Sequence, residues 1–137
     1  MYEILIVGGG PAGLTAAMYA ARAGKHVAVL ERGSTGGQII SAPLVENYPG
    51  IPSVSGTELA RQMTEQACTF GAEIVYTEAV GLEKTSAGFR VLCMDGVREA
   101  KAVILATGAA HRQLGLAAEA ALTGCGVSYC AVCDGAF

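Results

Sequence analysis

The sequence predicts an α/β fold built on a parallel β-sheet. Three observations predict it: a short buried apolar run closed by glycines at residues 2–10, an alanine-rich helical stretch at 11–24, and a second apolar run at 25–32. A strand, a glycine turn, a helix and a strand within about thirty residues have the size of a βαβ unit. Such a unit makes its two strands parallel and its crossover right-handed.

The first helix has Pro11 near its start and Gly24 at its expected C-cap. A long glycine- and proline-rich segment follows at 33–56, and such segments are usually functional loops or disordered. A second helix is expected at 55–71, capped by Ser55 or Thr57 and ended by Gly71. Its core-facing side is expected to consist of Leu59, Met63, Cys68 and Phe70.

Three further strands are expected at 73–85, 88–96 and 97–108. An Asp-Gly pair at 95–96 predicts a hairpin between the last two. From about Leu114 the periodicity weakens to a short helical patch and a linker-like glycine pair.

Composition sets the class of protein. The chain has 137 residues, is 52% hydrophobic and 15% charged, and carries a net charge of −3, so it suits one ordinary globular domain. Its 9 basic residues are scattered, which argues against a nucleic-acid partner. The N-terminal apolar run is too short to span a bilayer and lacks a preceding basic residue, so the expected compartment is the cytoplasm, without a membrane partner.

A glycine loop follows the first strand. Gly8, Gly10 and Gly13 have the spacing G-x-G-x-x-G, in which the first turns the chain, the second lets a pyrophosphate approach and the third allows close packing of helix on strand. Glu31 ends the next strand, where a carboxylate can hydrogen-bond an adenosine ribose. The loop predicts a Rossmann-like dinucleotide site but leaves FAD and a nicotinamide nucleotide as alternatives.

Cys130 and Cys133 form a C-x-x-C pair, followed directly by Asp134. This spacing allows a disulfide and often lowers the pKa of one thiol, and Asp134 could exchange a proton with a leaving thiolate. Two alternatives stay open: a zinc site with His111 and Cys125, and two passive cysteines. Structural zinc sites usually contain two tight pairs, which favours the redox interpretation and predicts no metal.

The remaining cysteines and histidines have plainer interpretations. Cys68 and Cys93 are expected in the core, whereas Cys125 is ambiguous and could be an exposed thiol. His26 is expected on the surface, and His111 has no obvious partner in the sequence.

The glycine loop, Glu31, "GGQ", "ENYPG", "ATG" and "CAVCDGAF" occur in one order along the whole chain. Together they closely resemble the N-terminal part of the bacterial-type, low-molecular-weight thioredoxin reductases. The resemblance implies a Rossmann-like FAD-binding domain of three layers, with a parallel sheet plus a small β-meander, incomplete at its C-terminus. It implies that residues 1–113 belong to the FAD-binding domain and 114–137 to a linker and the start of an NADPH and redox-disulfide domain.

The resemblance also implies roles for individual residues. The pyrophosphate loop would hold FAD, Glu31 would hold the ribose, and Cys130 would exchange with thioredoxin while Cys133 faces the flavin and Asp134 acts as general acid. The positions implied to bind FAD are Gly8, Gly10, Pro11, Ala12, Gly13, Glu31, Gly36, Gly37, Gln38, Asn47, Thr107, Gly108 and Ala109.

The implied activity is electron transfer from NADPH to FAD, then to the disulfide and then to thioredoxin, in a homodimer. NADPH rather than NADH rests on the family alone. The chain departs from the family pattern at Cys125, where a basic residue is common, and at 116–121, which lack the usual proline and paired acids.

Most of a nucleotide domain and a returning C-terminal segment are absent, so the chain is expected to be a fragment without NADPH-dependent turnover of its own. The alternatives are a flavin-binding module and a related flavoprotein of the alkyl hydroperoxide reductase type, which is disfavoured because it carries an extra N-terminal region.

Overall fold

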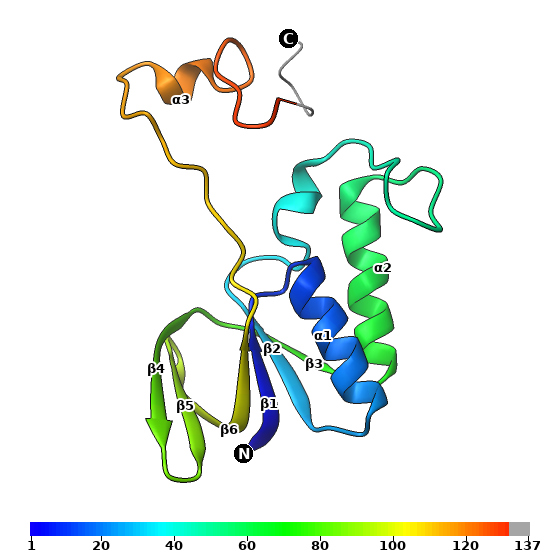
Figure 1. Cartoon of the computed structure of the whole chain (residues 1–137), viewed down its shortest axis with the longest axis vertical. Helices are drawn as coiled ribbons and strands as arrows, with labels where there is room; N and C mark the ends of the chain where they lie inside the picture. Colours follow the sequence, from blue (N-terminus) through cyan, green and yellow to red (C-terminus); the bar gives the residue numbers. More distant parts are fainter. Residues whose placement is uncertain (132–137) are drawn as a thin grey trace.

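The computed structural model describes residues 1–131 and confirms the α/β class (Figure 1). In chain order the elements are β1 (Tyr2–Val7), α1 (Pro11–Arg22), β2 (Val27–Glu31), the 3-10 helix η1 (Gly37–Ser41), α2 (Gly56–Thr69), β3 (Glu73–Tyr76), β4 (Ala79–Thr85), β5 (Gly88–Cys93), β6 (Gly96–Leu105) and α3 (Glu119–Leu122).

All six strands form one sheet in the order β3-β2-β1-β6-β5-β4. The first four of these strands are parallel, as the predicted βαβ unit requires, while β4, β5 and the start of β6 form an antiparallel meander. β6 belongs to both parts. Ala100 pairs with Phe89 of the meander and with Tyr2 of β1, so one long strand joins the meander to the parallel sheet.

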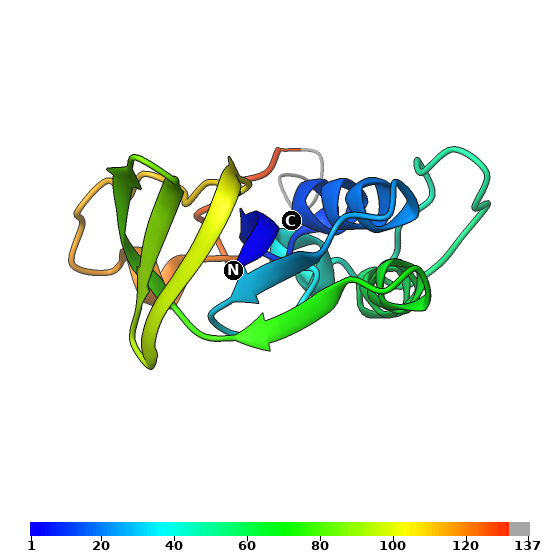
Figure 2. The ribbon, with the colours of Figure 1, turned by 90° about the horizontal axis from the view of Figure 1, so that it is seen from below.

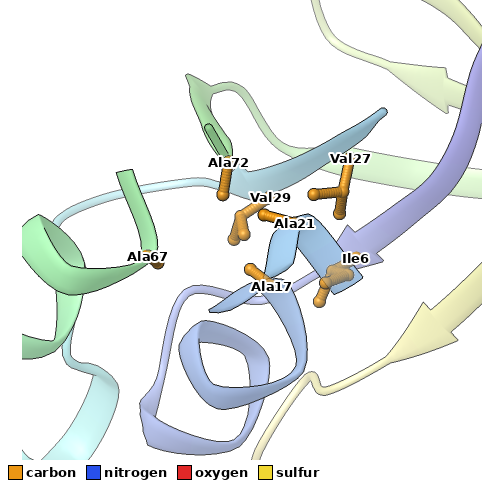
Figure 3. Packing of buried hydrophobic residues seen from close by; sticks show 7 residues of the cluster. All are labelled: Ile6, Ala17, Ala21, Val27, Val29, Ala67 and Ala72. Atoms are coloured by element: carbon orange, nitrogen blue, oxygen red, sulfur yellow. The ribbon is translucent and has the colours of Figure 1, made fainter. Parts of the chain in front are cut away.

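The central parallel strands, β1 and β2, carry the residues that are buried on both faces. Side chains alternate along a strand, so Ile6, Val27 and Val29 point to one face, where they pack with Ala17 and other small residues of the two helices (Figure 3). The complete buried set on this face is Ile6, Ala17, Ala21, Val27, Val29, Ala67 and Ala72.

The opposite face packs against the meander. Leu5 and Leu30 are buried there together with Val91 and Cys93 of β5. Figure 2 shows α1 and α2 on one side of β1 and β2, and the meander strands β4 and β5 on the other. The expected three layers are confirmed, and the meander supplies the third.

The expected strand at 73–85 is two strands. β3 ends the parallel sheet and β4 starts the meander, with the break at Thr77 and Glu78. The Thr77 N–H donates to the Glu31 carbonyl at 2.9 Å, and its hydroxyl donates to Asp95 Oδ1 at 2.5 Å. Asp95 lies in the predicted hairpin turn, so the buried Thr77 joins the two parts of the sheet.

Replacement of Thr77 by valine is expected to lower the free energy of unfolding by about 1 kcal/mol. The change keeps the side-chain volume but removes the hydroxyl donor to Asp95. Asp95 keeps its pair with Arg98, so the loss is limited to one bond. Urea unfolding measures the change, and an unaltered midpoint would show that Thr77 does not stabilise the junction.

Helix α2 confirms the Ser55 cap but only part of the expected core face. Ser55 Oγ accepts the Glu58 N–H at 3.2 Å, and Leu59 is buried. Cys68 and Phe70 are exposed, so their assignment to the core is wrong. The small Ala67 takes the buried position in the last turn instead, in the cluster that it shares with Ala17 and Val29.

The segment 33–56 is ordered by local backbone bonds. Its first part forms η1, and its second forms a small hairpin in which Val45 and Val54 exchange backbone hydrogen bonds of 2.7 and 3.1 Å. After β6 the chain runs beyond the sheet to α3 (Figure 1). Within residues 1–131, no helix has the length and apolar character needed to cross a membrane.

Candidate functional site

Three loops meet at the carboxyl ends of β1, β2 and β6. The Gly8 N–H donates to the Leu30 carbonyl at 2.9 Å, and the Ala106 N–H donates to the Val7 carbonyl at 2.8 Å, so the three strand ends are held side by side. β2 and β6 lie on opposite sides of β1. Parallel α/β sheets bind ligands in the crevice that forms at such a switch in strand order.

Close packing of the backbone requires glycine at two positions of the loop, with or without a ligand. Gly8 has φ of +107°, and a Cβ there would lie 2.2 Å from the Ala106 carbonyl oxygen. A Cβ on Gly13 would lie 1.9 Å from the Gly8 carbonyl oxygen. At Gly8 and Gly13 the loop therefore packs against the end of β6 and the start of α1 without space for a side chain.

Gly10 differs from both. Its φ is −74°, which any residue adopts, and the nearest atom to an added Cβ is Gly37 Cα at 4.0 Å. It is the N-cap of α1 and offers no side-chain cap, and no atom of the protein crowds the backbone at this positive end of the helix. Packing within the protein does not explain this glycine, whereas a pyrophosphate lying against the backbone does.

Glu31 is fixed beside the loop by backbone donors. Its Oε2 accepts the Gly9 N–H at 2.7 Å and its Oε1 accepts the Gly33 N–H at 2.8 Å. A carboxylate has about four acceptor sites, so each oxygen keeps capacity for a ribose hydroxyl. The sequence did not indicate that Glu31 also binds the glycine loop itself.

The "GGQ" segment joins the glycine loop to the segment after β6. The Gly36 N–H donates to the Gly9 carbonyl at 2.7 Å, and Gln38 Nε2 donates to the Ala109 carbonyl at 2.5 Å. Thr107 lies directly beside Gly8, its Cα 3.3 Å from the position of an added Cβ. The structure thus brings together nearly all the positions expected to hold the cofactor: Gly8, Gly10, Pro11, Ala12, Gly13, Glu31, Gly36, Gly37, Gln38, Thr107, Gly108 and Ala109.

Asn47 is the exception among the cofactor positions. It is exposed on the hairpin between Val45 and Val54, and within residues 1–131 no hydrogen bond joins its side chain to the glycine loop. A separate groove of about 510 Å³ lies between residues 34–35 and α2, lined by hydroxyl and charged side chains including Thr64 and Arg61.

Replacement of Glu31 by glutamine is expected to weaken dinucleotide binding about tenfold, or ~1.4 kcal/mol. The amide nitrogen of glutamine would face one of the two N–H donors that Glu31 now accepts, so Gly9 or Gly33 loses its partner. Fluorescence titration with FAD measures the affinity. The exposed Glu99 supplies the matched control, as Glu99→Gln should not change the affinity.

Of the three expected catalytic residues, only Cys130 lies within the described range, in the segment that follows α3. Its N–H donates to Ser128 Oγ at 3.1 Å. Cys133 and Asp134 lie outside the described residues. Among residues 1–131, no three His, Cys, Asp or Glu side chains are grouped as a metal site.

The cysteines and histidines outside the C-x-x-C pair can be compared with their expected positions. Cys93 is buried and His26 lies on the surface beside Glu73, both as expected, and Cys125, which the sequence left ambiguous, is exposed. His111, for which the sequence offered no obvious partner, stacks its ring on Tyr129 with centroids 5.0 Å apart.

Sequence reasoning missed Glu119. Its side chain is buried although it is an acid, and its carboxylate accepts several hydrogen bonds near Cys130. The only signal in the sequence was a single acid within an otherwise apolar short helix.

The chain matches known proteins over its whole length. Residues 2–137 match the model of the family described as pyridine nucleotide-disulphide oxidoreductase. Thioredoxin reductases of Listeria monocytogenes and Bacillus subtilis are 46% and 44% identical to it, each over 100% of this chain and 43% of their own length.

Solved structures of thioredoxin reductases are also similar to the chain. The thioredoxin reductase of Streptococcus pyogenes superposes with a TM-score of 0.87 at 50% identity and that of Lactococcus lactis with 0.85 at 43% identity, each covering 100% of this chain and 45% of theirs. The chain therefore spans less than half the length of these relatives. With this fold, this glycine loop and a family match over nearly every residue, the chain belongs to the pyridine nucleotide-disulphide oxidoreductase family.

Proposed function

We propose that this chain is the FAD-binding and disulfide-bearing part of a thioredoxin reductase. The observation that carries the proposal is the contrast within the glycine loop. A side chain at Gly8 or Gly13 would clash with neighbouring backbone, whereas one at Gly10, at the N-terminus of a helix, would meet no atom closer than 4.0 Å. A backbone surface kept free at this point suits a pyrophosphate.

The residues at the strand ends suit FAD. Backbone N–H groups of residues 12 and 13 would bind the pyrophosphate, and Glu31 would accept from the ribose. The segments 36–38 and 107–109, joined by the bond from Gln38 to Ala109, would flank the flavin. Bound FAD would supply a two-electron relay between a hydride donor and a dithiol. The family resemblance is the ground for including Asn47, which lies on the exposed hairpin and would help to hold the flavin ring.

Cys130 and Cys133 would form the redox pair. We infer that the Cys130 thiolate attacks a disulfide of thioredoxin, that Cys133 then displaces the reduced thioredoxin, and that Asp134 gives a proton to the leaving thiolate. The thioredoxin disulfide is reduced and the chain's dithiol is oxidised, so the electrons balance. Relatives named thioredoxin reductase over the whole of this chain support the assignment.

Further features are proposed on the strength of the family resemblance. We propose that residues 1–113 are the FAD-binding part and 114–137 the linker and start of the NADPH and disulfide domain. The whole enzyme would take its electrons from NADPH and act as a cytoplasmic homodimer. The reducing conditions of the cytoplasm suit a cysteine pair that cycles between dithiol and disulfide.

A trapping experiment tests the redox role. The probe is a thioredoxin that keeps only its exposed active-site cysteine, activated as a mixed disulfide with an aromatic thiol. The Cys133→Ser chain should displace the aromatic thiolate and accumulate a mixed disulfide through Cys130. The Cys130→Ser chain should react at least about tenfold more slowly, because Cys130 is the cysteine assigned to exchange with thioredoxin, whereas Cys133 is assigned to the flavin side. Equal rates for the two variants would contradict the assigned roles.

A further inference from the structure

The buried carboxylate of Glu119 holds together the segment 114–130, which we call the arm. Only 5% of Glu119 is exposed. Its Oε1 accepts the Leu114 N–H at 2.8 Å, and its Oε2 accepts the N–H groups of Gly115 at 2.7 Å and Leu116 at 3.2 Å. These backbone donors lower the pKa of Glu119, and the Leu114 N–H has the largest effect. The carboxylate is therefore charged at neutral pH.

The same carboxylate also binds the far end of the arm. The Tyr129 hydroxyl donates to Glu119 Oε1, and the Tyr129 ring stacks on His111 with an angle of 14° between the ring planes. Tyr129 directly precedes Cys130. One side chain therefore joins the start of the arm, at residues 114–116, to the residue next to the redox pair.

Backbone bonds close the arm between these ends. The Val127 N–H donates to the Leu122 carbonyl at 2.9 Å, and Thr123 Oγ1 donates to the Glu119 carbonyl at 2.9 Å. The four-residue α3 is too short to be stable alone. The arm therefore depends on hydrogen bonds to Glu119 for its order.

We propose that Glu119 is a positioning residue for the cysteine pair, acting through Tyr129 on Cys130. The inference rests on the proposed redox role of Cys130 and Cys133. Fixing a residue's backbone carries an entropic cost. Since Glu119 and Tyr129 already order the chain up to Cys130, less ordering remains when the disulfide closes, and the disulfide is favoured over the dithiol.

The test measures the thiol–disulfide equilibrium of the 137-residue chain in mixtures of reduced and oxidised dithiothreitol. In this exchange the dithiol of the chain is oxidised as dithiothreitol disulfide is reduced. Alkylation and peptide mass mapping report the Cys130–Cys133 pair separately from the three other cysteines. Variants are Glu119→Ala, Tyr129→Phe, which keeps the ring on His111 but removes the hydroxyl, and the surface control Glu99→Gln.

The equilibrium constant for disulfide formation should fall about tenfold in Glu119→Ala and about threefold in Tyr129→Phe, and should be unchanged in Glu99→Gln. Amide exchange at residues 114–116 should quicken in Glu119→Ala, while α1 and α2 keep their protection. Faster exchange there with an unchanged equilibrium constant would overturn the inference, leaving Glu119 with a purely structural role. Failure of the unsubstituted chain to form a reversible disulfide would instead refute the proposed function, and the positioning role with it.

Discussion

Replacement of Gly13 by alanine is expected to lower the free energy of unfolding by about 3 kcal/mol or more. The added methyl group would lie 1.9 Å from the Gly8 carbonyl oxygen, far inside van der Waals contact. Both groups belong to backbone that is held by β1, α1 and β6, so neither can move without breaking sheet or helix bonds. Urea or thermal unfolding followed by circular dichroism measures the loss.

The matched control for Gly13→Ala is the same substitution at Gly24. That residue has φ of +71° but no atom within 4 Å of an added Cβ. Gly24→Ala should cost only the backbone strain, about 1 kcal/mol. Equal destabilisation by the two substitutions would contradict the claim that close packing, rather than backbone conformation, requires Gly13.

Replacement of Gly10 by alanine is expected to leave the fold intact and to weaken FAD binding by about 100-fold, or ~2.7 kcal/mol. An alanine fits the φ of −74°, and its Cβ meets no atom closer than 4.0 Å. The free energy of unfolding should change by less than about 1 kcal/mol, as for other changes at a helix N-cap. The methyl group would, however, occupy the space that the pyrophosphate needs.

Fluorescence titration with FAD, beside urea unfolding of the same sample, separates the two effects. Unchanged FAD affinity in Gly10→Ala would mean that the open space at the helix N-terminus is not the pyrophosphate site. A large loss of stability would mean that Gly10 serves the fold, as Gly8 and Gly13 do.

Much of the fold could be predicted because its signals are local. The run at 2–10, the helix after Pro11 and the Asp-Gly hairpin each depend on neighbouring residues, and the structure confirms them. The split between β3 and β4 could not be predicted, since it depends on contacts of Thr77 with residues distant in sequence, Glu31 and Asp95. Burial of Ala67 in place of Cys68 likewise depends on residues distant in sequence, including Ala17 and Val29 of the same cluster.

The candidate site divides in the same way. Spacing identified Gly8, Gly10 and Gly13, but only the three-dimensional packing separates the two that the fold requires from the one that faces open space. The bond between Gln38 and Ala109 joins residues 71 apart in sequence and leaves no periodic signal. Glu119 was missed because its partners are backbone groups, which every residue possesses.

The most direct test of the central claim is amide hydrogen exchange of the chain with and without FAD. The claim is that three loops at the carboxyl ends of β1, β2 and β6 form one dinucleotide site. It predicts that FAD slows exchange in residues 9–14, 36–38 and 107–109 together, and that the groove beside Arg61 and Thr64 is unaffected. Protection of that groove, or of one loop without the other two, would contradict the claim.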